Sequence, residues 1–479
     1  MDFPPTEHLD SGSVRRLDGF GQTVAEDAYV YRVSSVEEIL RVFDLARIVK
    51  RQVVLRGSGR SYGDASLLSE ALAIDIRGMN KVISWDPTSG VLEIEAGATL
   101  EQVWRLTLPD GWWPPVVSGT MKPTLAGALA MNIHGKNAFR AGPIGEHVLA
   151  LTCVCPSGVV LHLTPEDPRF FHFISSAGLL GVITVVKLQM KKVASGDLRV
   201  LALSRSGWDA QFDAFETYSS SADYMVSWVD AFARGRSAGR GLFHAGWYAD
   251  GEPSTLLESH QDLPQKILGV VPKSEVWRLL RPLNNQVGMR LLNSLKHHSA
   301  RLIGHGREHR QSLVAFSFLL DYVPDWRKAY LPGGFIQFQS FVPAEHARAV
   351  FASQVRMQQE AGLESFLAVL KRHRKDAFAN SHGVNGYSLA LDFKVTATNW
   401  PTLERLCHGM SDLVRSSNGR FYLAKDSILR PDDVELPQSL LDLKHELDPE
   451  NLLSSALSDR LRLWEPRKPS GSSSSQDTI

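Results

Sequence analysis

Cysteine is scarce in this sequence, with three residues among 479. Cys153, Cys155 and Cys407 are odd in number and lack the paired C-x-x-C spacing of zinc sites. We therefore expect neither a disulfide framework nor a bound metal. Cys153 and Cys155 lie two residues apart in the apolar stretch VLALTCVC, so they should point to the same face of a strand and pack in a core.

Long apolar runs and an excess of charge are also missing. No uninterrupted apolar run approaches the roughly 20 residues that span a bilayer, and residues 1–16 contain no apolar signal-peptide core. Lys and Arg together number 52, as do Asp and Glu, so the chain has no overall field that would attract nucleic acid. These absences predict a cytoplasmic protein with no nucleic-acid partner and at most peripheral membrane contact.

The composition is that of a globular protein, with 43% hydrophobic and 22% charged residues. The chain is too long for one ordinary core, so we expect two large domains or one domain with a large insertion. Two capping boxes, Ser35 with Glu38 and Thr99 with Gln102, predict the starts of helices. Strands are predicted at residues 52–57, 71–76, 91–97, 147–155, 158–164 and 178–190. Up to residue 192 the pattern indicates an α+β domain.

Aromatic residues become frequent after about residue 193, which indicates a second domain. Within it, residues 273–310 carry many Lys, Arg and His side chains among leucines. Such a segment could be a mobile cover over the site, could touch a membrane surface, or could be a solvated pair of amphipathic helices. Residues 466–479 are small and polar and should be disordered.

A glycine-rich stretch, RGSGRSYGD at residues 56–64, follows the first predicted strand. Glycines at a strand end let the backbone approach phosphate oxygens closely, which suits a nucleotide. The spacing G-x-G-x-x-x-G is one residue off the Rossmann fingerprint, and a strand follows it where a Rossmann unit has a long helix. No Gly-Lys-Ser/Thr closes it as in a P-loop. Taken alone, the stretch is equally consistent with a tight turn.

A second cluster of small residues covers SGT at 118–120, PTLAGA at 123–128 and NIHGKN at 132–137. Three such loops, separated by short apolar pieces, suit a backbone that wraps around a long ligand such as a dinucleotide. The two clusters together therefore favour nucleotide binding over isolated turns.

The segments RGSGRSYGD, SGTMKPTLAGALAMNIHGKN and GRFYLAKDS together resemble the vanillyl-alcohol-oxidase class of flavoproteins, which bind FAD in a PCMH-type domain. Within this class, residues 20–463 are most similar to the FAD-containing oxidase subunits of decaprenylphosphoryl-β-D-ribose 2′-epimerases. The resemblance implies an α+β fold: a two-lobed FAD-binding domain with an inserted substrate domain built on an antiparallel sheet. It divides the chain into an N-terminal extension (1–19), an FAD-binding domain (20–192), a substrate domain (193–410) with a segment that could be mobile (251–310), a C-terminal return to the FAD-binding domain (411–465) and a disordered tail (466–479).

The resemblance also implies a reaction, the oxidation of a secondary sugar hydroxyl to a ketone with hydride transfer to FAD. In that family an NADH-dependent keto-reductase partner then forms the inverted sugar, and the pair acts as an epimerase in cell wall arabinan biosynthesis. We expect a sugar substrate linked to polyprenyl phosphate. One alternative is an alditol or aldonolactone oxidase that passes electrons to oxygen. Another is a non-catalytic protein that keeps the fold to bind a nucleotide or lipid carrier.

Related sugar-alcohol oxidases carry a histidine bonded covalently to the flavin where Arg60 stands here. Arginine cannot form that bond, so we expect non-covalent FAD, with Arg60 near its charged groups. By the resemblance, the FAD-contacting residues are Arg56, Gly57, Ser58, Gly59, Arg60, Ser61, Tyr62, Ser118, Gly119, Thr120, Lys122, Ala128, Asn132, His134, Gly135, Asn137, Gly178, Gly181, Ile183, Tyr422 and Lys425.

Lys425 and His134 are the predicted catalytic residues. Alcohol oxidation by a flavin needs a base for the hydroxyl proton and a positive or hydrogen-bonding group near the flavin's pyrimidine end. Lys425 matches the family's active-site lysine. Its ordinary pKa of about 10.4 would have to be lowered by burial or nearby cations before it could act as a base. We therefore expect positioning and charge stabilisation ahead of base catalysis, while His134 matches a residue on the substrate side of the flavin.

The predicted substrate pocket includes Gln337 and Gln339, which alternate along one strand so that both amides can face one side. The resemblance adds Lys136, Trp228 and Lys371. Three further positions depart from the family: Ser388 replaces an asparagine of the mycobacterial type, Ala390 replaces a cysteine, and Ser317 replaces a tyrosine. The pocket is therefore chemically altered, and inhibitors that trap the cysteine should not attach.

Overall fold

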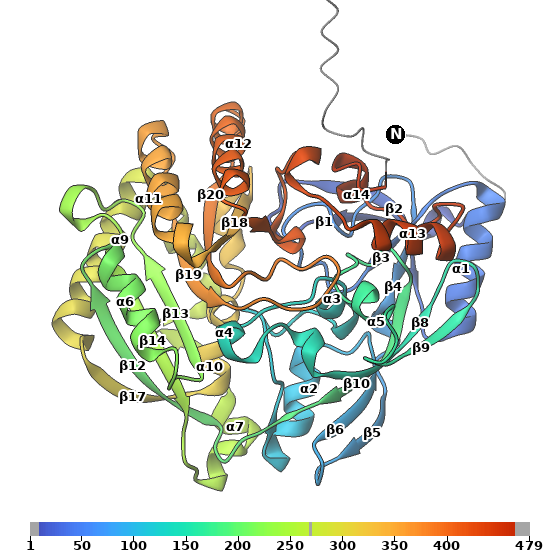
Figure 1. Cartoon of the computed structure of the whole chain (residues 1–479), viewed down its shortest axis with the longest axis horizontal. Helices are drawn as coiled ribbons and strands as arrows, with labels where there is room; N and C mark the ends of the chain where they lie inside the picture. Colours follow the sequence, from blue (N-terminus) through green and yellow to red (C-terminus); the bar gives the residue numbers. More distant parts are fainter. Residues whose placement is uncertain (1–8, 268–270, 465–479) are drawn as a thin grey trace, which may run out of the picture.

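The computed structural model describes residues 9–267 and 271–464. These residues form three large sheets of four, five and eight strands, and two sheets of two strands. In Figure 1 the blue N-terminal elements and the red C-terminal helices gather on one side, and the green to orange elements gather on the other. Helices are interleaved with largely antiparallel sheets, which confirms the predicted α+β class.

The four-stranded sheet, in the order β1-β2-β4-β3, leads into the glycine-rich stretch. Its strands β2, β4 and β3 are parallel, whereas β1 is antiparallel to β2. The helix α1 buries Ile39, Val42 and Phe43 in the core beside this sheet. Ser35 caps α1, but the Glu38 carboxylate bonds to Ser34, so half of the predicted capping box forms. The bounds are β1 Val14–Asp18, β2 Ala25–Arg32, α1 Val36–Val49, β3 Val53–Arg56 and β4 Leu72–Asp75.

The five-stranded sheet, in the order β5-β6-β10-β8-β9, is antiparallel. Helix α2 begins at the predicted capping box of Thr99 and Gln102. Cys153 and Cys155 are fully buried in the adjoining core, as predicted. The bounds are β5 Val82–Asp86, β6 Val91–Glu95, α2 Leu100–Thr107, β7 Trp112–Trp113, α3 Leu125–Ala130, α4 Ala138–Ala141, β8 Val148–Val154, β9 Val160–Leu163, α5 Phe170–Phe173, β10 Val182–Gln189 and β11 Lys191–Lys192, with β7 and β11 paired.

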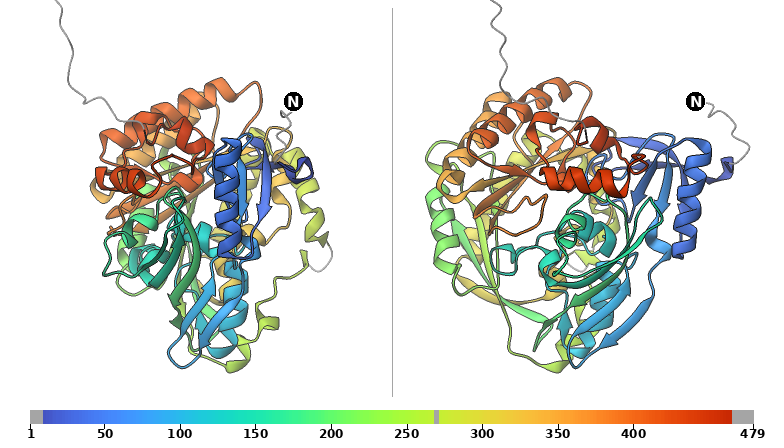
Figure 2. Two further views of the ribbon diagram at one scale, coloured as in Figure 1. Left: turned by 90° about the vertical axis from the view of Figure 1, so that its right-hand side faces the viewer. Right: turned by 45° about the vertical axis from the view of Figure 1, so that its right-hand side comes forward.

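The eight-stranded sheet has the order β17-β12-β14-β13-β19-β20-β18-β21 and is antiparallel throughout. Apolar residues on one of its faces pack against α6, α11 and α12 in a shared core. Figure 2 shows α11 and α12 together near the top of both views. The bounds are β12 Asp197–Arg205, α6 Trp208–Tyr218, β13 Tyr224–Val229, β14 Gly241–Tyr248, β17 Arg307–Ser312, α10 Leu313–Ser317, β18 Phe335–Pro343, α11 Ala344–Ala361, β19 Leu367–His373, β20 Gly386–Lys394, α12 Trp400–Ser416 and β21 Arg420–Phe421.

The C-terminal part of the chain lies beside the N-terminal sheet (Figure 1). Val53 forms a parallel bridge with Leu453, and the amide of Ala456 donates to the carbonyl of Leu67 at 2.7 Å. This segment contains α13 Gln438–Leu447 and α14 Ala456–Arg460. The strand β1 lies within the expected extension 1–19 and pairs with β2, and the expected boundary at residue 410 falls inside helix α12.

The segment 251–310 contains helices and short strands where the structure describes it, and its mobility stays a prediction. These elements are α7 Glu258–Gln261, the pair β15 Lys266–Ile267 and β16 Val271–Pro272, α8 Val276–Leu280 and α9 Gln286–Ser299, followed by a π-helical turn, Ala300–Gly304. The predicted tail at 466–479 falls outside the described residues. In the part of the chain that is described, no helix combines the length and the apolar character needed to cross a membrane.

Candidate active site

A cavity of about 570 Å³ lies between the glycine-rich stretch, the second small-residue cluster and the eight-stranded sheet. Six of its lining side chains are cationic, and no carboxylate lines it among the described residues. Two of the cations belong to the glycine-rich stretch and four lie toward the sheet: Arg56, Arg60, Lys136, Lys296, Lys371 and Lys425. A cavity with this charge suits anionic ligands.

The glycine-rich stretch leaves β3 at Arg56 and requires glycine at two positions. A Cβ atom on Gly57 would lie 2.3 Å from Oγ1 of Thr124, and Gly59 has a φ of 60°. The Arg56 guanidinium holds the turn by donating to the carbonyls of Ser66 at 3.3 Å and Asp18 at 2.9 Å. The missing side chains leave backbone facing the cavity, which is where a phosphate can approach closely.

Arg60 lies at this end of the cavity and has no acidic hydrogen-bond partner among the described residues. Its Nε atom is buried and makes no hydrogen bond within residues 9–267 and 271–464, and its guanidinium carbon lies 5.6 Å from the ring centroid of Phe20. Burial and then the nearby Arg327 lower the pKa of Arg60. A half-buried cation with an unused donor fits the pyrophosphate of a dinucleotide such as FAD.

The segment 118–124 forms the neighbouring wall and is held from outside by Asp321. The Asp321 carboxylate accepts from Oγ1 of Thr120 at 2.8 Å and from the amide of Met121 at 2.7 Å. Thr124 then caps α3 by accepting from the amide of Gly127 at 3.2 Å. Ser118, Gly119 and Thr120 line the cavity as a result.

Six predicted site residues do not line the cavity, so their contacts with cofactor or substrate stay predictions. Three of their side chains bond within the protein: Lys122 pairs with Glu101 at 2.5 Å, Asn132 accepts from the amide of Gly145, and Asn137 donates to the carbonyl of Pro115. They support the wall from behind. The six are Lys122, Ala128, Asn132, Gly135, Asn137 and Ser388. All the other predicted site residues line the cavity.

One face of the eight-stranded sheet forms the far wall of the cavity. The strand register places Gln339 opposite Ala390 and Val369 opposite both Ala390 and Trp228. Alternate residues of each strand therefore point to the same side. The lining residues from this face are Val226, Trp228, His244, Gln337, Gln339, Leu367, Val369, Lys371 and Ala390.

Lys425 lies where the C-terminal segment meets the glycine-rich stretch. Its Nζ atom is 3.7 Å from the ring centroid of Tyr62, whose amide donates to the carbonyl of Ala424 at 2.9 Å. Burial lowers the pKa of Lys425, and burial raises the pKa of the nearby Asp392 carboxyl. Gln337 donates to Asp392 and so fixes the side chain next to this pair. Lys425 therefore loses its proton at a lower pH than an exposed lysine does.

His134 belongs to a buried group of three histidines. Its Nδ1 lies 3.0 Å from Nε2 of His382, its Nε2 lies 3.2 Å from the amide nitrogen of Gln339, and its ring centroid is 5.1 Å from that of His373. Burial, followed by the charge of Lys371, holds the pKa of His134 well below its usual range. The ring is therefore neutral near pH 7, with one nitrogen unprotonated.

Lys136 and Lys371 supply further positive charge to the sheet end of the cavity. Lys136 donates to the carbonyl of Phe316 and lies 4.3 Å from the ring centroid of that residue. Burial and then the charge of Lys371 lower the pKa of Lys136 to about 7, and burial lowers that of Lys371 to about 8. An anion bound between them would favour their charged forms.

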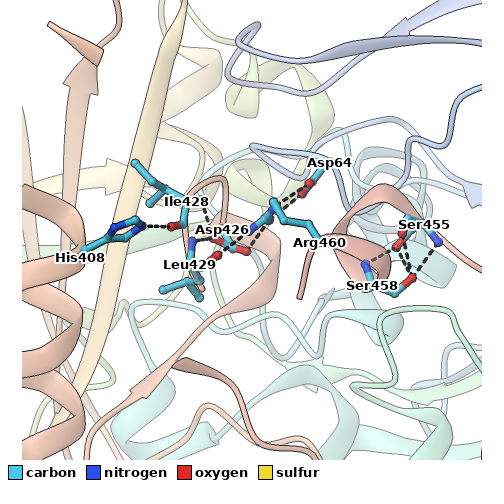
Figure 3. Close-up of polar contacts among 8 residues, drawn as sticks. All are labelled: Asp64, His408, Asp426, Ile428, Leu429, Ser455, Ser458 and Arg460. Carbon is cyan, nitrogen blue, oxygen red and sulfur yellow. Dashed lines mark hydrogen bonds and ion pairs between the residues drawn. The ribbon is translucent and has the colours of Figure 1, made fainter. Parts of the chain in front are cut away.

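An ion-pair network fastens the C-terminal segment to the glycine-rich stretch (Figure 3). Arg460 donates to both carboxylate oxygens of Asp64, at 2.8 and 3.0 Å, and to Asp426 at 2.7 Å. Asp426 also accepts from the amides of Ile428 and Leu429, both at 2.8 Å. Because Asp426 follows Lys425, the network fixes the backbone that carries the predicted catalytic lysine.

Several residues of the site were not predicted from the sequence. His244, Val369 and Lys296 line the cavity, and His373 and His382 surround His134. Val369 and His373 alternate with the predicted Lys371 on β19, so period two was a usable signal for them. His382 lies in a loop between strands, where no local pattern points to it.

Comparison with known proteins places these features in a family. A family model described as an FAD binding domain matches residues 28–164, which contain the glycine-rich stretch and the second cluster. The decaprenylphosphoryl-β-D-ribose oxidase of Mycolicibacterium smegmatis is 30% identical, over 96% of this chain and 99% of that protein. A putative D-arabinono-1,4-lactone oxidase of Neurospora crassa is 34% identical over 32% of this chain and 27% of that protein. A D-lactate dehydrogenase of Anaerostipes hadrus is 26% identical over 35% of this chain and 37% of that protein.

The similarity over nearly the whole chain, together with the matched FAD binding domain, settles the family and the cofactor. The relatives are oxidases and dehydrogenases that share the FAD-binding part. The chain belongs to the PCMH-type FAD-binding family and is an FAD-dependent oxidoreductase that acts on CH–OH groups.

Proposed function

We propose that the enzyme oxidises a secondary hydroxyl of a polyprenyl-phosphate-linked sugar to a ketone. The observation that carries this proposal is that the cations lie in two separate groups, one at each end of the cavity. Arg56 and Arg60 lie at the glycine-rich end, where the FAD pyrophosphate would bind. Lys136 and Lys371 lie at the other end, beside the neutral amides of the sheet, and no carboxylate balances them in the described lining. These lysines fit the phosphate of the substrate.

The wide likeness to the M. smegmatis oxidase supports the same substrate class. That protein is named for a sugar linked to decaprenyl phosphate, and the alignment covers 96% of this chain, so it extends well beyond the FAD-binding part. The lactone oxidase and lactate dehydrogenase alignments cover about a third of this chain. They therefore support the FAD-binding part and give little weight to a soluble lactone or hydroxy acid as substrate.

The residues of the cavity have separate tasks in this proposal. Bound FAD supplies the two-electron acceptor for the hydride that leaves the carbinol carbon. His134, neutral because it is buried, accepts the hydroxyl proton as the C=O bond forms. Lys425 stabilises negative charge and positions the reacting groups, and Gln337 and Gln339 orient the sugar through hydrogen bonds.

Non-covalent attachment of FAD forms part of the proposal. Arg60 occupies the position of the covalent histidine found in related sugar-alcohol oxidases, and guanidinium cannot make that bond. Acid precipitation of the yellow protein should leave the flavin in the supernatant. Colour that stays with the protein pellet would contradict this part without touching the substrate assignment.

Anaerobic flavin reduction tests the substrate class. The panel consists of polyprenyl-phosphoryl pentoses, the same pentoses without phosphate, and free polyols. We expect bleaching by the phosphorylated sugars, and we expect Lys371→Met to raise their half-saturating concentration by at least about tenfold while free sugars are unaffected. Bleaching by free polyols alone, with hydrogen peroxide released in air, would instead support the alditol or aldonolactone oxidase.

The fate of the product follows from the same proposal. A ketone formed on a lipid-linked sugar needs a reductase to complete an epimerisation, so an NADH-dependent keto-reductase is the expected partner. Addition of such a reductase and NADH to the reaction should convert the ketone to the inverted sugar, which chromatography of the released sugar would detect.

A further inference from the structure

Helix α9 is amphipathic in the reverse sense to an ordinary surface helix. Its buried residues are the small or polar Gly288, Asn293 and His297. Three of its large apolar side chains are exposed, with Val287 80%, Leu291 56% and Leu295 58% exposed, whereas Met289 packs against a core. A surface helix of a globular protein normally buries its apolar stripe and exposes its polar face. The apolar face of α9 is therefore exposed, whereas such a face normally packs against a core.

The exposed side chains form a continuous stripe along one side of the segment. Spacings of four residues along α9 place Val287, Leu291 and Leu295 above one another. Leu283 lies just before the helix, and the π-helical turn adds two more. We call this set the α9 stripe: Leu283, Val287, Leu291, Leu295, Leu302 and Ile303, all exposed. Single exposed leucines are ordinary, but a contiguous apolar patch marks an interaction surface.

Polar contacts attach α9 to the rest of the protein. Ser294 accepts from Arg240 at 3.1 Å, and Arg290 pairs with Glu364 at 3.2 Å. These contacts lie off the stripe, so the stripe can be covered without unpacking the helix. The residues of α9 that do reach inward include Lys296, which lines the cavity with its Nζ 4.4 Å from the ring centroid of Trp228. The same helix thus borders the cavity and carries the stripe.

The charge around the stripe identifies what covers it. Residues 273–310 contain eight Lys or Arg side chains and two Glu side chains, in a chain whose total charge is balanced. The exposed Arg278 and Arg281 precede the stripe in the sequence, and the exposed Arg301 lies within its range. Exposed leucines combined with surrounding basic residues are the composition of a helix that lies in the interface of an anionic bilayer. A protein partner with an apolar groove would not require this local excess of positive charge.

We propose that the α9 stripe inserts into the interfacial region of a bilayer that contains anionic lipids. The insertion places the wall of the cavity formed by Lys296 and Trp228 next to the membrane surface. This inference goes beyond the proposed reaction, because the enzyme could bind a membrane by this face whatever alcohol it oxidises. Its test accordingly uses no substrate.

The experiment is sedimentation of the full-length, FAD-loaded protein with sucrose-loaded vesicles. One vesicle set mixes phosphatidylglycerol with phosphatidylcholine, and the other contains phosphatidylcholine alone. We expect sedimentation with the anionic set, weaker binding at high salt, and at least about a tenfold loss of binding in L291E/L295E. Leu302→Glu, outside the helix proper, should show the same loss in part.

The matched control is Ile83→Glu, because Ile83 on β5 is 52% exposed, close to the 58% of Leu295. Flavin absorbance and unchanged thermal unfolding show that each variant is folded. The proposal is overturned if the wild type stays in the supernatant with both vesicle sets, or if I83E loses as much binding as L291E/L295E. It is also overturned if the wild type does not bind vesicles and light scattering shows a dimer that L291E/L295E abolishes. The stripe would then contact a second copy of the chain.

Discussion

The Nδ1 atom of His134 lies 3.0 Å from Nε2 of His382, while Nε2 of His134 faces the amide nitrogen of Gln339 at 3.2 Å. An amide nitrogen can only donate, so Nε2 of His134 accepts and its proton resides on Nδ1. His382 receives that proton's hydrogen bond. Burial lowers the pKa of His382 to about 3, so it stays neutral and remains an acceptor. His382 therefore selects the tautomer of His134 in which Nε2 is unprotonated and accepts from Gln339.

His382→Phe should slow flavin reduction at saturating substrate by at least about tenfold, because the Nδ1 proton of His134 loses its acceptor. His382→Gln keeps an acceptor in reach and should restore most of the rate. Stopped-flow absorbance at several substrate concentrations separates the rate from the half-saturating concentration, which should not change. A purely structural role for His382 would instead weaken FAD binding in both variants, and an unchanged rate in H382F would refute the tautomer argument.

Lys425→Ala should keep its yellow colour but lose substrate-driven bleaching by about 100-fold or more, because a group that stabilises developing charge is removed. The Lys425 side chain rests on the Tyr62 ring, and its charge also favours the ionised form of the buried Asp392 carboxyl, so K425A should raise the pKa of Asp392 as well. Lys394→Ala is the control, since Lys394 donates to the carbonyl of Asn284 outside the cavity. Unchanged bleaching in K425A would refute the role assigned to this lysine.

The stability of the protein should rise with pH partly through Lys136. The pKa of Lys136 is lowered from 10.5 to about 7 by burial and by Lys371. Between these values the unfolded chain binds a proton that the folded chain does not, so the free energy of unfolding increases with pH, by up to about 1.4 kcal/mol per pH unit from this group. Below about pH 7 both states are protonated and the increase stops.

Lys136→Met should flatten this rise, while Lys50→Met, at the exposed end of α1, should leave it intact. Urea unfolding followed by tryptophan fluorescence across the pH window measures both slopes. Lys371, whose pKa is also lowered, keeps part of the rise in K136M. Parallel slopes for the wild type and K136M would show that Lys136 is not held uncharged by its surroundings.

The glycine-rich wall of the cavity was predictable because its signal is local. Gly57 and Gly59 lie two residues apart and directly follow a strand, so the pattern itself indicates a backbone turn. Alternation on β18 likewise predicts that Gln337 and Gln339 share a face, and both line the cavity. Local spacing and strand periodicity thus recover the inner surface of single elements.

Contacts between distant segments were beyond such patterns. His134 and His382 are 248 residues apart, and Asp64 and Arg460 are 396 apart. No local sequence pattern indicates which residue each of them contacts. Each pair forms only when the eight-stranded sheet and the C-terminal segment pack against the N-terminal half. The same limit explains Lys122 and Asn137, whose motif predicts a ligand contact although their side chains bond to Glu101 and Pro115.

Ala390 should make the enzyme insensitive to thiol-directed electrophiles. It lines the cavity, and the cysteines Cys153, Cys155 and Cys407 are all buried, with burial raising the pKa of the Cys155 thiol to about 12. Ala390→Cys should be alkylated and inactivated, since a thiol beside buried lysines ionises readily. Mass spectrometry counts the adducts, and A390S controls for the change in the pocket. Inactivation of the wild type, with an adduct on a native cysteine, would contradict this.

Arg460→Met should lower the free energy of unfolding by about 3 kcal/mol, because it leaves two largely buried carboxylates without their counterion. The side chains of Asp64 and Asp426 are 12% and 1% exposed, and Arg460 bonds to both (Figure 3). The two backbone amides that also donate to Asp426 keep the loss below the largest values for such pairs. Flavin reduction should slow as well, since Asp426 anchors the residue next to Lys425.

The control for R460M is Arg199→Met, which removes an exposed pair with Glu308 at 2.9 Å and should cost less than about 1 kcal/mol. Urea titration of both variants gives the comparison. A second variant, R460M/D64N, removes one of the stranded charges and should recover part of the stability. Equal losses in R460M and R199M would mean that the network contributes no more than a surface ion pair. Its position between the glycine-rich stretch and the C-terminal segment would then be incidental to the placement of Lys425.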